Sequence, residues 1–268
     1  MGCRRRYLGR DSPQALWRTH SDAVNLSLLA RWLPKERVRR LLKTDVFDEA
    51  FGEGLIPLLM SRAEHLVNMD VSLSAIGSAR KRYPRIRVVG VDVRSLPFTD
   101  DTFDMIVSTS TLDHFLSRDD IMISLRELYR VLRPGGQLIL TLDNPANPVV
   151  ALRNVLPFRP LYRLGVLPYF VGATAGPCSL PPRLRQIGFG VQEVGYVLHC
   201  PRLLAVPIAR ILEKYAVQKA HRRFLRVMMA FEHFSHWPTR FLTGHFIAVR
   251  AAKPRAIPSS SPSHDEIG

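Results

Sequence analysis

A glycine-containing turn and two acidic residues have the types and spacing expected of a nucleotide-binding site. The turn at 46–54 reads VFDEAFGEG and stands where a strand is expected to give way to a helix. Glycines in such a turn let the backbone approach a ligand closely, and the helix N-terminus presents free N–H groups. This signal alone is weak, because glycine turns occur in any open α/β sheet.

The two acids are Asp70 and Asp92, each at the expected end of a later strand. Asp70 follows Asp48 by 22 residues, where a carboxylate can accept hydrogen bonds from both hydroxyls of a ribose. Asp92 can accept a hydrogen bond from the exocyclic amine of adenine, with Val93 against the ring. Asp70 taken alone could equally be an acidic helix cap. A glycine turn, an acid and an acid on three successive strands together indicate nucleotide recognition.

Metal chemistry is not expected. The histidines show no spacing that we assign to metal ligands, and His233 and His236 lack an obvious third ligand. The three cysteines, Cys3, Cys178 and Cys200, form neither a zinc motif nor a disulfide framework, which favours a reducing cytoplasm.

Short apolar runs alternate with helical patterns along the chain. Strands are expected at 45–50, 65–70, 87–92, 103–108, 137–142, 190–198 and 243–251, and helices at 54–64, 72–82 and 119–132. One long or two broken amphipathic helices are expected at 203–231, and one or two helices between 12 and 42, interrupted at Pro34. This order predicts an α/β, Rossmann-like, seven-stranded, mostly parallel sheet with helices on both faces, an antiparallel edge and a helical cap region.

The same pattern divides the chain into four parts. Residues 1–43 are expected to form a helical lid segment, 44–145 the nucleotide-binding core, 146–256 the acceptor-side helices and final strands of the same domain, and 257–268 a disordered tail.

Three segments carry a resemblance to a known family. They are Leu96-Pro97-Phe98, the run DTFDMIV at 101–107, and LRELYRVLRPGG at 125–136. The chain over 44–145 is similar to the class I S-adenosylmethionine-dependent methyltransferases of the small-molecule, type 11-like group. The resemblance implies S-adenosyl-L-methionine as cofactor, held by Asp48, Glu49, Ala50, Gly52, Gly54, Asp70, Val71, Asp92, Val93 and Ser108.

The turn departs from the family pattern at three positions. The family usually has glycine where this chain has Ala50, and small uncharged residues where it has Glu49 and Glu53. A carboxylate there could pair with the cationic end of the cofactor or face solvent.

The resemblance also implies acceptor contacts after the fourth strand, at 108–115. His114 has a pKa suited to proton removal, and Asp113 precedes it, so both are candidate catalytic residues. A packing or cofactor-side role for His114 is the favoured alternative. Methyl transfer by in-line displacement depends mostly on positioning and desolvation, so a base is required only where the acceptor loses a proton.

The charge is concentrated in the second half of the chain. Residues 1–150 carry 22 Lys/Arg and 18 Asp/Glu, whereas residues 151–258 carry 16 and 3. Apolar stretches at 149–171 and 203–229 interrupted by cations suit a small or lipid-like acceptor at an anionic membrane surface. The alternative is a helical cap with a solvated basic face, since 32 of the 38 cations are Arg. Nucleic acid is not expected as a partner, no run of apolar residues is long enough to span a membrane, and the oligomeric state stays open.

The expected function is therefore O- or C-methylation of a small or lipid-like acceptor in the cytoplasm, with peripheral membrane contact left open. One alternative is a binding or assembly protein that keeps the fold without transferring a methyl group, which Ala50 and Glu53 favour. A nicotinamide-dependent oxidoreductase is another, although the Pro134-Gly135-Gly136 turn fits the methyltransferase pattern better.

Overall fold

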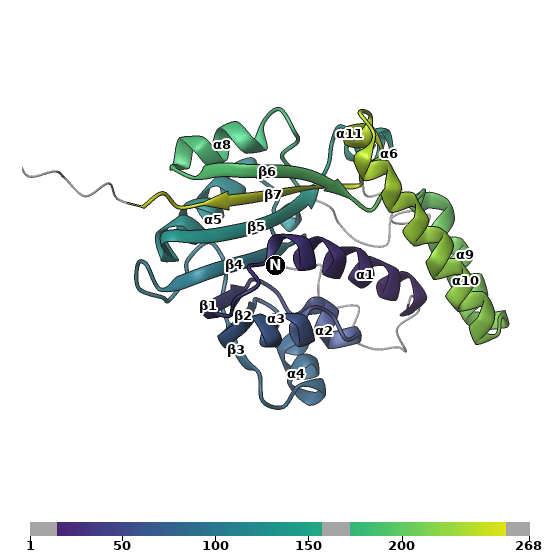
Figure 1. Cartoon of the computed structure of the whole chain (residues 1–268), viewed down its shortest axis with the longest axis horizontal. Coiled ribbons are helices and arrows are strands. Elements are labelled where there is room, and N and C mark those ends of the chain that lie inside the picture. Colours follow the sequence, from purple (N-terminus) through teal and green to yellow (C-terminus); the bar gives the residue numbers. More distant parts are fainter. Residues whose placement is uncertain (1–14, 157–171, 256–268) are drawn as a thin grey trace, which may run out of the picture.

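A seven-stranded sheet with helices on both faces organises the structure, a computed structural model that describes residues 15–156 and 172–255 (Figure 1). The strand order is β3-β2-β1-β4-β5-β7-β6. The strands are β1 (Val38–Lys43), β2 (Ala63–Asp70), β3 (Arg87–Gly90), β4 (Phe103–Thr109), β5 (Leu132–Asp143), β6 (Gly190–Val197) and β7 (Phe246–Ala252). Strands β1 to β5 pair in parallel, and β7 pairs antiparallel with both β5 and β6. The predicted α/β fold with an antiparallel edge is confirmed.

Side chains alternate between two cores, one on each face of the sheet. In β4, Met105 and Val107 belong to one core, whereas Ile106 belongs to the other. Ile139 and Leu140 of β5 divide in the same way. This period of two is what a strand covered on both faces produces, and it explains why the central strands read as continuous apolar runs.

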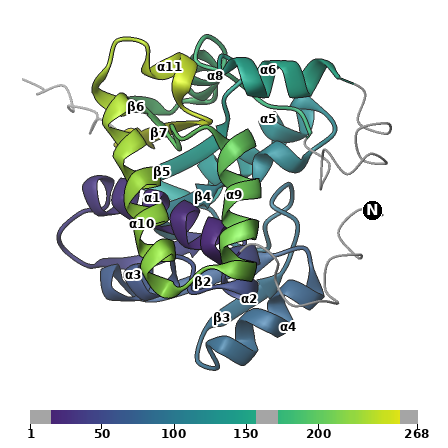
Figure 2. The same cartoon turned by 90° about the vertical axis from the view of Figure 1, so that its right-hand side faces the viewer.

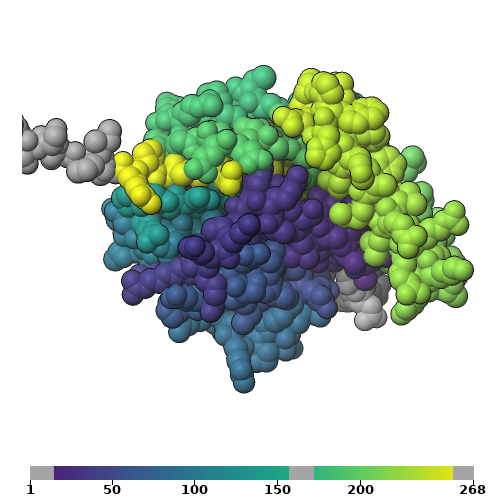
Figure 3. All heavy atoms as spheres, viewed as in Figure 1, coloured from purple at the N-terminus to yellow at the C-terminus, as the bar shows by residue number. Residues whose placement is uncertain are grey.

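The helices form a layer on each side of the sheet. They are α1 (Ala15–Trp32), α2 (Phe47–Phe51), α3 (Ile56–Arg62), α4 (Leu73–Arg82), α5 (Arg118–Val131), α6 (Pro148–Val155), α8 (Leu180–Ile187), α9 (Arg202–Tyr215), α10 (Gln218–Ala230) and α11 (Arg240–Thr243), with short 3-10 turns η2 (Leu112–His114) and η3 (Phe231–His236). Helices α5 and α8 pack on one face. Helix α1 lies across the other face and contacts α9 and α10, which form a hairpin at the side of the molecule (Figures 1 and 3).

The predicted first strand at 45–50 is wrong. The first strand is β1, and residues Phe47–Phe51 form the short helix α2 instead. Leu41 and Leu42 of β1 face opposite cores and pair with both β2 and β4. Because β1 carries Lys43 and two arginines, its sequence resembled the end of the preceding helical segment. The central sheet thus begins six residues before the expected boundary at 44.

Other elements differ from the predictions mainly at their ends. The helix expected at 54–64 is the shorter α3, and the segment at 203–231 forms two helices, α9 and α10. The expected turn at 134–136 lies within β5, where Gly135 has a φ of +81°. The predicted disordered tail and the first residues of the lid segment lie outside the described residues.

The described residues contain neither a membrane-spanning helix nor a cluster of metal-binding side chains. No helix at 15–156 or 172–255 is both long and apolar enough to cross a bilayer. Within the same ranges, no group of three or more His, Cys, Asp or Glu side chains could hold a metal ion.

Candidate functional site

Four carboxylates surround one buried lysine between β1 and α2. The Nζ of Lys43 lies 3.0 Å from Oε2 of Glu49 and 3.5 Å from Oδ1 of Asp45. Asp48 follows on α2, and Asp22 reaches the same place from α1, where its Oδ2 lies near Gly52. We call Asp22, Asp45, Asp48 and Glu49 the acidic cluster. It lies at the carboxyl end of β1, the edge at which ligands bind in open α/β sheets.

The four carboxylates of the acidic cluster outnumber the cationic side chains beside them. Burial, followed by repulsion from Asp45, Asp22 and Glu49, raises the pKa of Asp48 to about 7. Burial and then Glu49 raise the pKa of Asp22 to about 6. A cationic ligand would relieve this repulsion, so the chemistry of the cluster fits a group that carries positive charge.

Glu49 also fills the space beside the glycine turn. Its Oε1 accepts a hydrogen bond from the N–H of Leu55 at 2.9 Å. Gly54 has a φ of +59°, and a Cβ built on it would lie 2.5 Å from that same Oε1. In this conformation the missing side chain of Gly54 therefore makes room for Glu49 rather than for a ligand.

Asp70 ends β2 beside the start of this loop. Its Oδ2 accepts from the N–H of Val46 at 3.2 Å, and its Oδ1 accepts from the N–H of Ser72 at 2.8 Å. The carboxylate therefore joins the carboxyl ends of β1 and β2. The N-cap of α4 is Ser72, whose Oγ accepts from the N–H of Ala75, so Asp70 is not the helix cap that the sequence left open. Val71, the next residue, is exposed.

The remaining expected cofactor residues lie along the same edge. Asp92 is half-buried and holds the exposed Arg94, with its Oδ2 2.7 Å from a guanidinium nitrogen, whereas Val93 is buried. The hydrogen bond from Arg94 keeps the pKa of Asp92 low. Ser108, fully buried in β4, accepts a hydrogen bond from Thr44. Ala50 lies on α2.

Asp113 and His114 form part of η2, after β4. Oδ1 of the buried Asp113 lies 3.8 Å from Nε2 of His114, whose side chain is 37% exposed. Burial raises the pKa of Asp113 to about 6. Its Oδ2 accepts from the N–H of Asp143 at 3.3 Å, whereas its Oδ1 has no hydrogen-bond partner among the described residues.

Asp143 connects η2 to a charged network at the end of β5. Its Oδ2 accepts from Arg153 at 2.9 Å, and its Oδ1 lies 3.4 Å from Nε2 of His245. Arg202 donates to the same nitrogen of His245 at 2.8 Å. Burial, followed by charge repulsion from Asp113, raises the pKa of Asp143 to about 6.

A cavity of about 250 Å³ adjoins this network. Its wall includes Arg202 and His245 together with apolar and aromatic side chains, among them Val149, Phe231 and Phe234. Its lining comes from α6, α9, η3 and the residues just before β7, all near the carboxyl end of β5. The cavity can therefore accept a mainly apolar molecule with a polar or anionic group.

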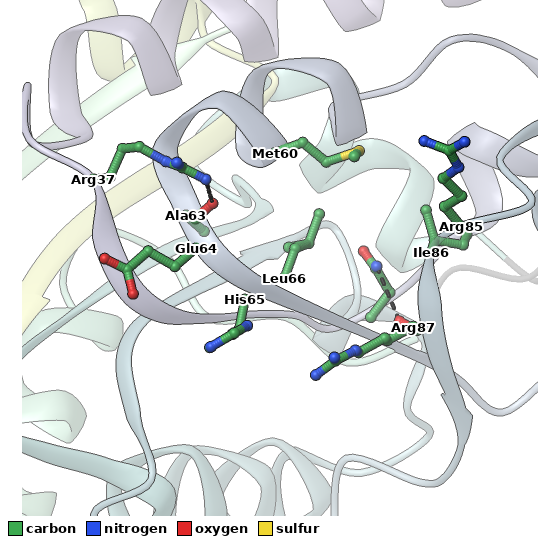
Figure 4. A pocket seen from close by; sticks show the side chains of 10 residues that line it. Arg37, Met60, Ala63, Glu64, His65, Leu66, Arg85, Ile86 and Arg87 are labelled. Atoms are coloured by element: carbon green, nitrogen blue, oxygen red, sulfur yellow. Dashed lines mark hydrogen bonds between the residues drawn. The ribbon is translucent and has the colours of Figure 1, made fainter.

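A second hollow of about 200 Å³ lies at the opposite edge of the sheet (Figure 4). Arg37, Arg85 and Arg87 line it near the starts of β1 and β3. Neither hollow is lined by the acidic cluster, Asp70 or Asp92.

Sequence reasoning missed several of these groups. The sequence predicts a helical lid at 1–43 and so places Asp22 and Lys43 outside the site, although a lysine inside the run VRRLLKT indicates a buried partner. The sequence indicates Arg153 only as one of the cations that interrupt an apolar stretch, and it gives no signal for Arg202. For His245 it shows only the lack of metal-ligand spacing. Their contacts join segments far apart in the sequence, so no local pattern reveals them.

This part of the chain is similar to known proteins. Residues 47–140 match the family model described as a methyltransferase domain. Demethylmenaquinone methyltransferase of Streptomyces avermitilis is 33% identical over 96 residues, which are 35% of this chain and 40% of that protein. The ubiquinone/menaquinone biosynthesis C-methyltransferase of Hahella chejuensis is 29% identical over 156 residues, which are 53% of this chain and 61% of the relative. The chain thus spans less than two thirds of these relatives.

Solved structures share the fold at low sequence identity. The crystal structure of the [4+2]-cyclase SpnF has a TM-score of 0.59 at 18% identity, covering 92% of this chain and 86% of that one. A SAM-dependent methyltransferase from Archaeoglobus fulgidus has a TM-score of 0.56 at 17% identity, covering 88% and 94%. Because a cyclase is among the similar structures, the fold alone does not decide the reaction.

Proposed function

We propose that this chain, whose residues 47–140 match the model of a methyltransferase domain, is a class I S-adenosylmethionine-dependent methyltransferase that transfers a methyl group to a small or lipid-like acceptor at oxygen or carbon. The observation that carries the proposal is the grouping at one sheet edge of the acidic cluster, Asp70 and the cavity beside Asp143. An acidic, nucleotide-compatible edge and an apolar cavity are the two parts that such a transfer needs.

S-Adenosylmethionine fits the acidic cluster in charge, because its ammonium and sulfonium groups are cations. Asp48, the partly exposed member of the cluster, would hold the cationic end while Glu49 stays paired with Lys43. Asp70 would accept from the ribose hydroxyls, and Asp92 with Val93 would hold the adenine. Gly52, Gly54, Ala50, Val71 and Ser108 complete the expected site. When bound, the cofactor supplies an electrophilic methyl carbon, so positioning and exclusion of water provide most of the catalysis.

The chain's own residues would then orient the acceptor and move one proton. The cavity walls would hold the apolar body of the acceptor, and Arg202 would contact its polar group. His114 would receive at Nδ1 the proton that a hydroxyl or ring carbon loses, while the Asp113 carboxylate, 3.8 Å from Nε2, stabilises the charged imidazole. The quinone-methylating relatives support a lipid-like acceptor.

Isothermal titration calorimetry with S-adenosylmethionine and S-adenosylhomocysteine tests the proposal. We expect saturable binding, which Asp70→Asn weakens by tenfold or more, since a charged hydrogen bond contributes about 1.5–3 kcal/mol. Asp100→Asn, at an exposed acid paired with Arg130 outside the site, is the matched control. NAD, titrated in parallel, should not bind. Absence of binding at millimolar cofactor would overturn the proposal.

The alternative is a binding or assembly protein that keeps the fold without methyl transfer. One observation favours it, namely that Glu49 already occupies the space beside Gly54. Formation of S-adenosylhomocysteine in the presence of reduced demethylmenaquinone as a probe acceptor separates the two functions.

A further inference from the structure

Helix α9 exposes an apolar face that nothing in the described residues covers. Leu204, Ile208, Ile211 and Tyr215 recur at helical spacing and are exposed, Tyr215 by 74%. The opposite side of the same helix is buried against the body of the protein through small residues such as Ala205. An amphipathic helix normally buries its apolar side, so an apolar stripe on the outer side calls for a partner.

The apolar stripe continues onto neighbouring elements. Figure 2 shows α6, α9 and α11 on one side of the molecule. Asn147, at the start of α6, donates to the carbonyl of Thr243 at the end of α11, and both residues line the cavity that also contacts α9. We call the exposed apolar side chains of α6, α9 and α11 and of the turn before α11 the apolar face, which includes Leu152, Leu204, Ile208, Ile211, Tyr215 and Trp237.

Cations border this face, and the local acids point inward. Helix α10 exposes Lys219, Arg222, Arg223 and Arg226 at helical spacing. The only acids at 194–255 are Glu213 and Glu232. Glu213 accepts from the N–H of Leu16 on α1, and Glu232 accepts from the backbone N–H groups of two residues after β6. The charge offered by this side of the described structure is therefore almost entirely positive.

We propose that the apolar face docks on an anionic lipid bilayer, with α9 at the level of the headgroups and α10 against the phosphates. Apolar side chains bordered by Lys and Arg are the pattern of helices that lie in a membrane interface. A second copy of the chain is the weaker fit, because a twofold interface would bring two cationic α10 helices together. The cavity lined by Val149 and Arg202 belongs to the docked elements, so a lipid-like molecule would reach it from the bilayer.

Sedimentation with vesicles tests the proposal on the whole chain. We expect binding to phosphatidylglycerol-rich vesicles, weaker binding in high salt, and little binding to vesicles of phosphatidylcholine alone. The double variant Arg222→Glu/Arg223→Glu should weaken binding by roughly tenfold or more, because each cation near an anionic surface contributes about 1 kcal/mol. Ile208→Asp should also weaken vesicle binding, because it removes an apolar contact with the bilayer.

Matched controls lie on α5, on the other face of the sheet. Ile123 and Arg126 are exposed there, so Ile123→Asp and Arg126→Glu should leave vesicle binding unchanged. Thermal unfolding of each variant shows that the fold is kept.

Three outcomes would overturn the proposal. They are no binding to anionic vesicles, equal binding to neutral vesicles, or light scattering that shows a dimer which Ile208→Asp dissociates. Vesicle binding does not depend on methyl transfer, so failure of the docking surface is distinguishable from failure of the proposed reaction.

Discussion

Lys43 and Glu49 form an ion pair that solvent does not reach: Nζ and Oε2 lie 3.0 Å apart, and the side chains are 1% and 0% exposed. Removing one member of a buried pair leaves a charge without its partner, whereas replacing both with apolar groups of similar size is often neutral. We therefore expect Glu49→Ala to lower the free energy of unfolding by about 3 kcal/mol, the lower end of the usual range because Asp45 remains beside Lys43.

The double variant Lys43→Met/Glu49→Leu should recover most of this loss, as measured by urea unfolding. Glu193→Ala, which breaks the exposed pair with Arg250, is the control and should cost less than about 1 kcal/mol. Additive losses in the double variant would show that the pair is not coupled.

Two glycines should respond in opposite directions to an added methyl group. Gly54 has a positive φ and faces Oε1 of Glu49, so Gly54→Ala should destabilise by about 1–2 kcal/mol from the backbone alone, and more from the contact. Gly77 lies inside α4 with nothing within 4 Å of an added Cβ, so Gly77→Ala should stabilise by about 0.5–1 kcal/mol. Thermal unfolding measures both. A neutral Gly54→Ala would mean that Glu49 moves aside easily.

The part of the fold around β4 and α5 could be predicted to within one or two residues. Its strand is an unbroken apolar run, and its helix begins after Ser117, whose side chain accepts from the N–H of Asp119. Where the apolar pattern and the capping residue agree, local sequence determines the element.

Strand β1 could not be predicted, because its last residue is a charged side chain buried in the interior. Lysine is almost never fully buried without a partner, and that partner, Glu49, lies on the next helix. The same holds for the candidate site. The position of Asp70 follows from the end of a strand, whereas Asp48 lies on α2 and Asp22 approaches from α1, and both of these depend on tertiary packing.

Asp22 gives the clearest pH prediction. Burial, then Glu49, raises its pKa to about 6, so the folded chain keeps a proton that the unfolded chain has released above about pH 4. The stabilisation from protonated Asp22 is present below pH 4 and is lost as the pH rises through about 6. Asp22→Asn, which cannot ionise, should therefore gain stability relative to the parent over this range, by up to about 1.4 kcal/mol per pH unit.

The quantity to measure by urea unfolding is the difference in free energy of unfolding between Asp22→Asn and the parent. The difference is needed because other groups also titrate in this pH range. Buried His20 and His199 have lowered pKa values and act in the opposite direction. Asp100→Asn, at an exposed position, is the control, and its free energy of unfolding should change with pH as that of the parent does. A difference in free energy of unfolding between Asp22→Asn and the parent that stays constant with pH would contradict the prediction.

His114 can be tested as the proton acceptor through the pH dependence of turnover. If the imidazole of His114 receives the acceptor's proton at Nδ1, His114→Gln should lower kcat by roughly 10²–10⁴-fold and leave cofactor affinity unchanged. It should also abolish the fall in kcat at low pH, because that fall reports protonation of the imidazole. Asp113→Asn should shift this fall in kcat to lower pH, since the nearby carboxylate favours the charged imidazole. If His114→Gln keeps a near-normal kcat and an unchanged pH profile, His114 has a packing role. A side chain that only fills space does not control how kcat depends on pH.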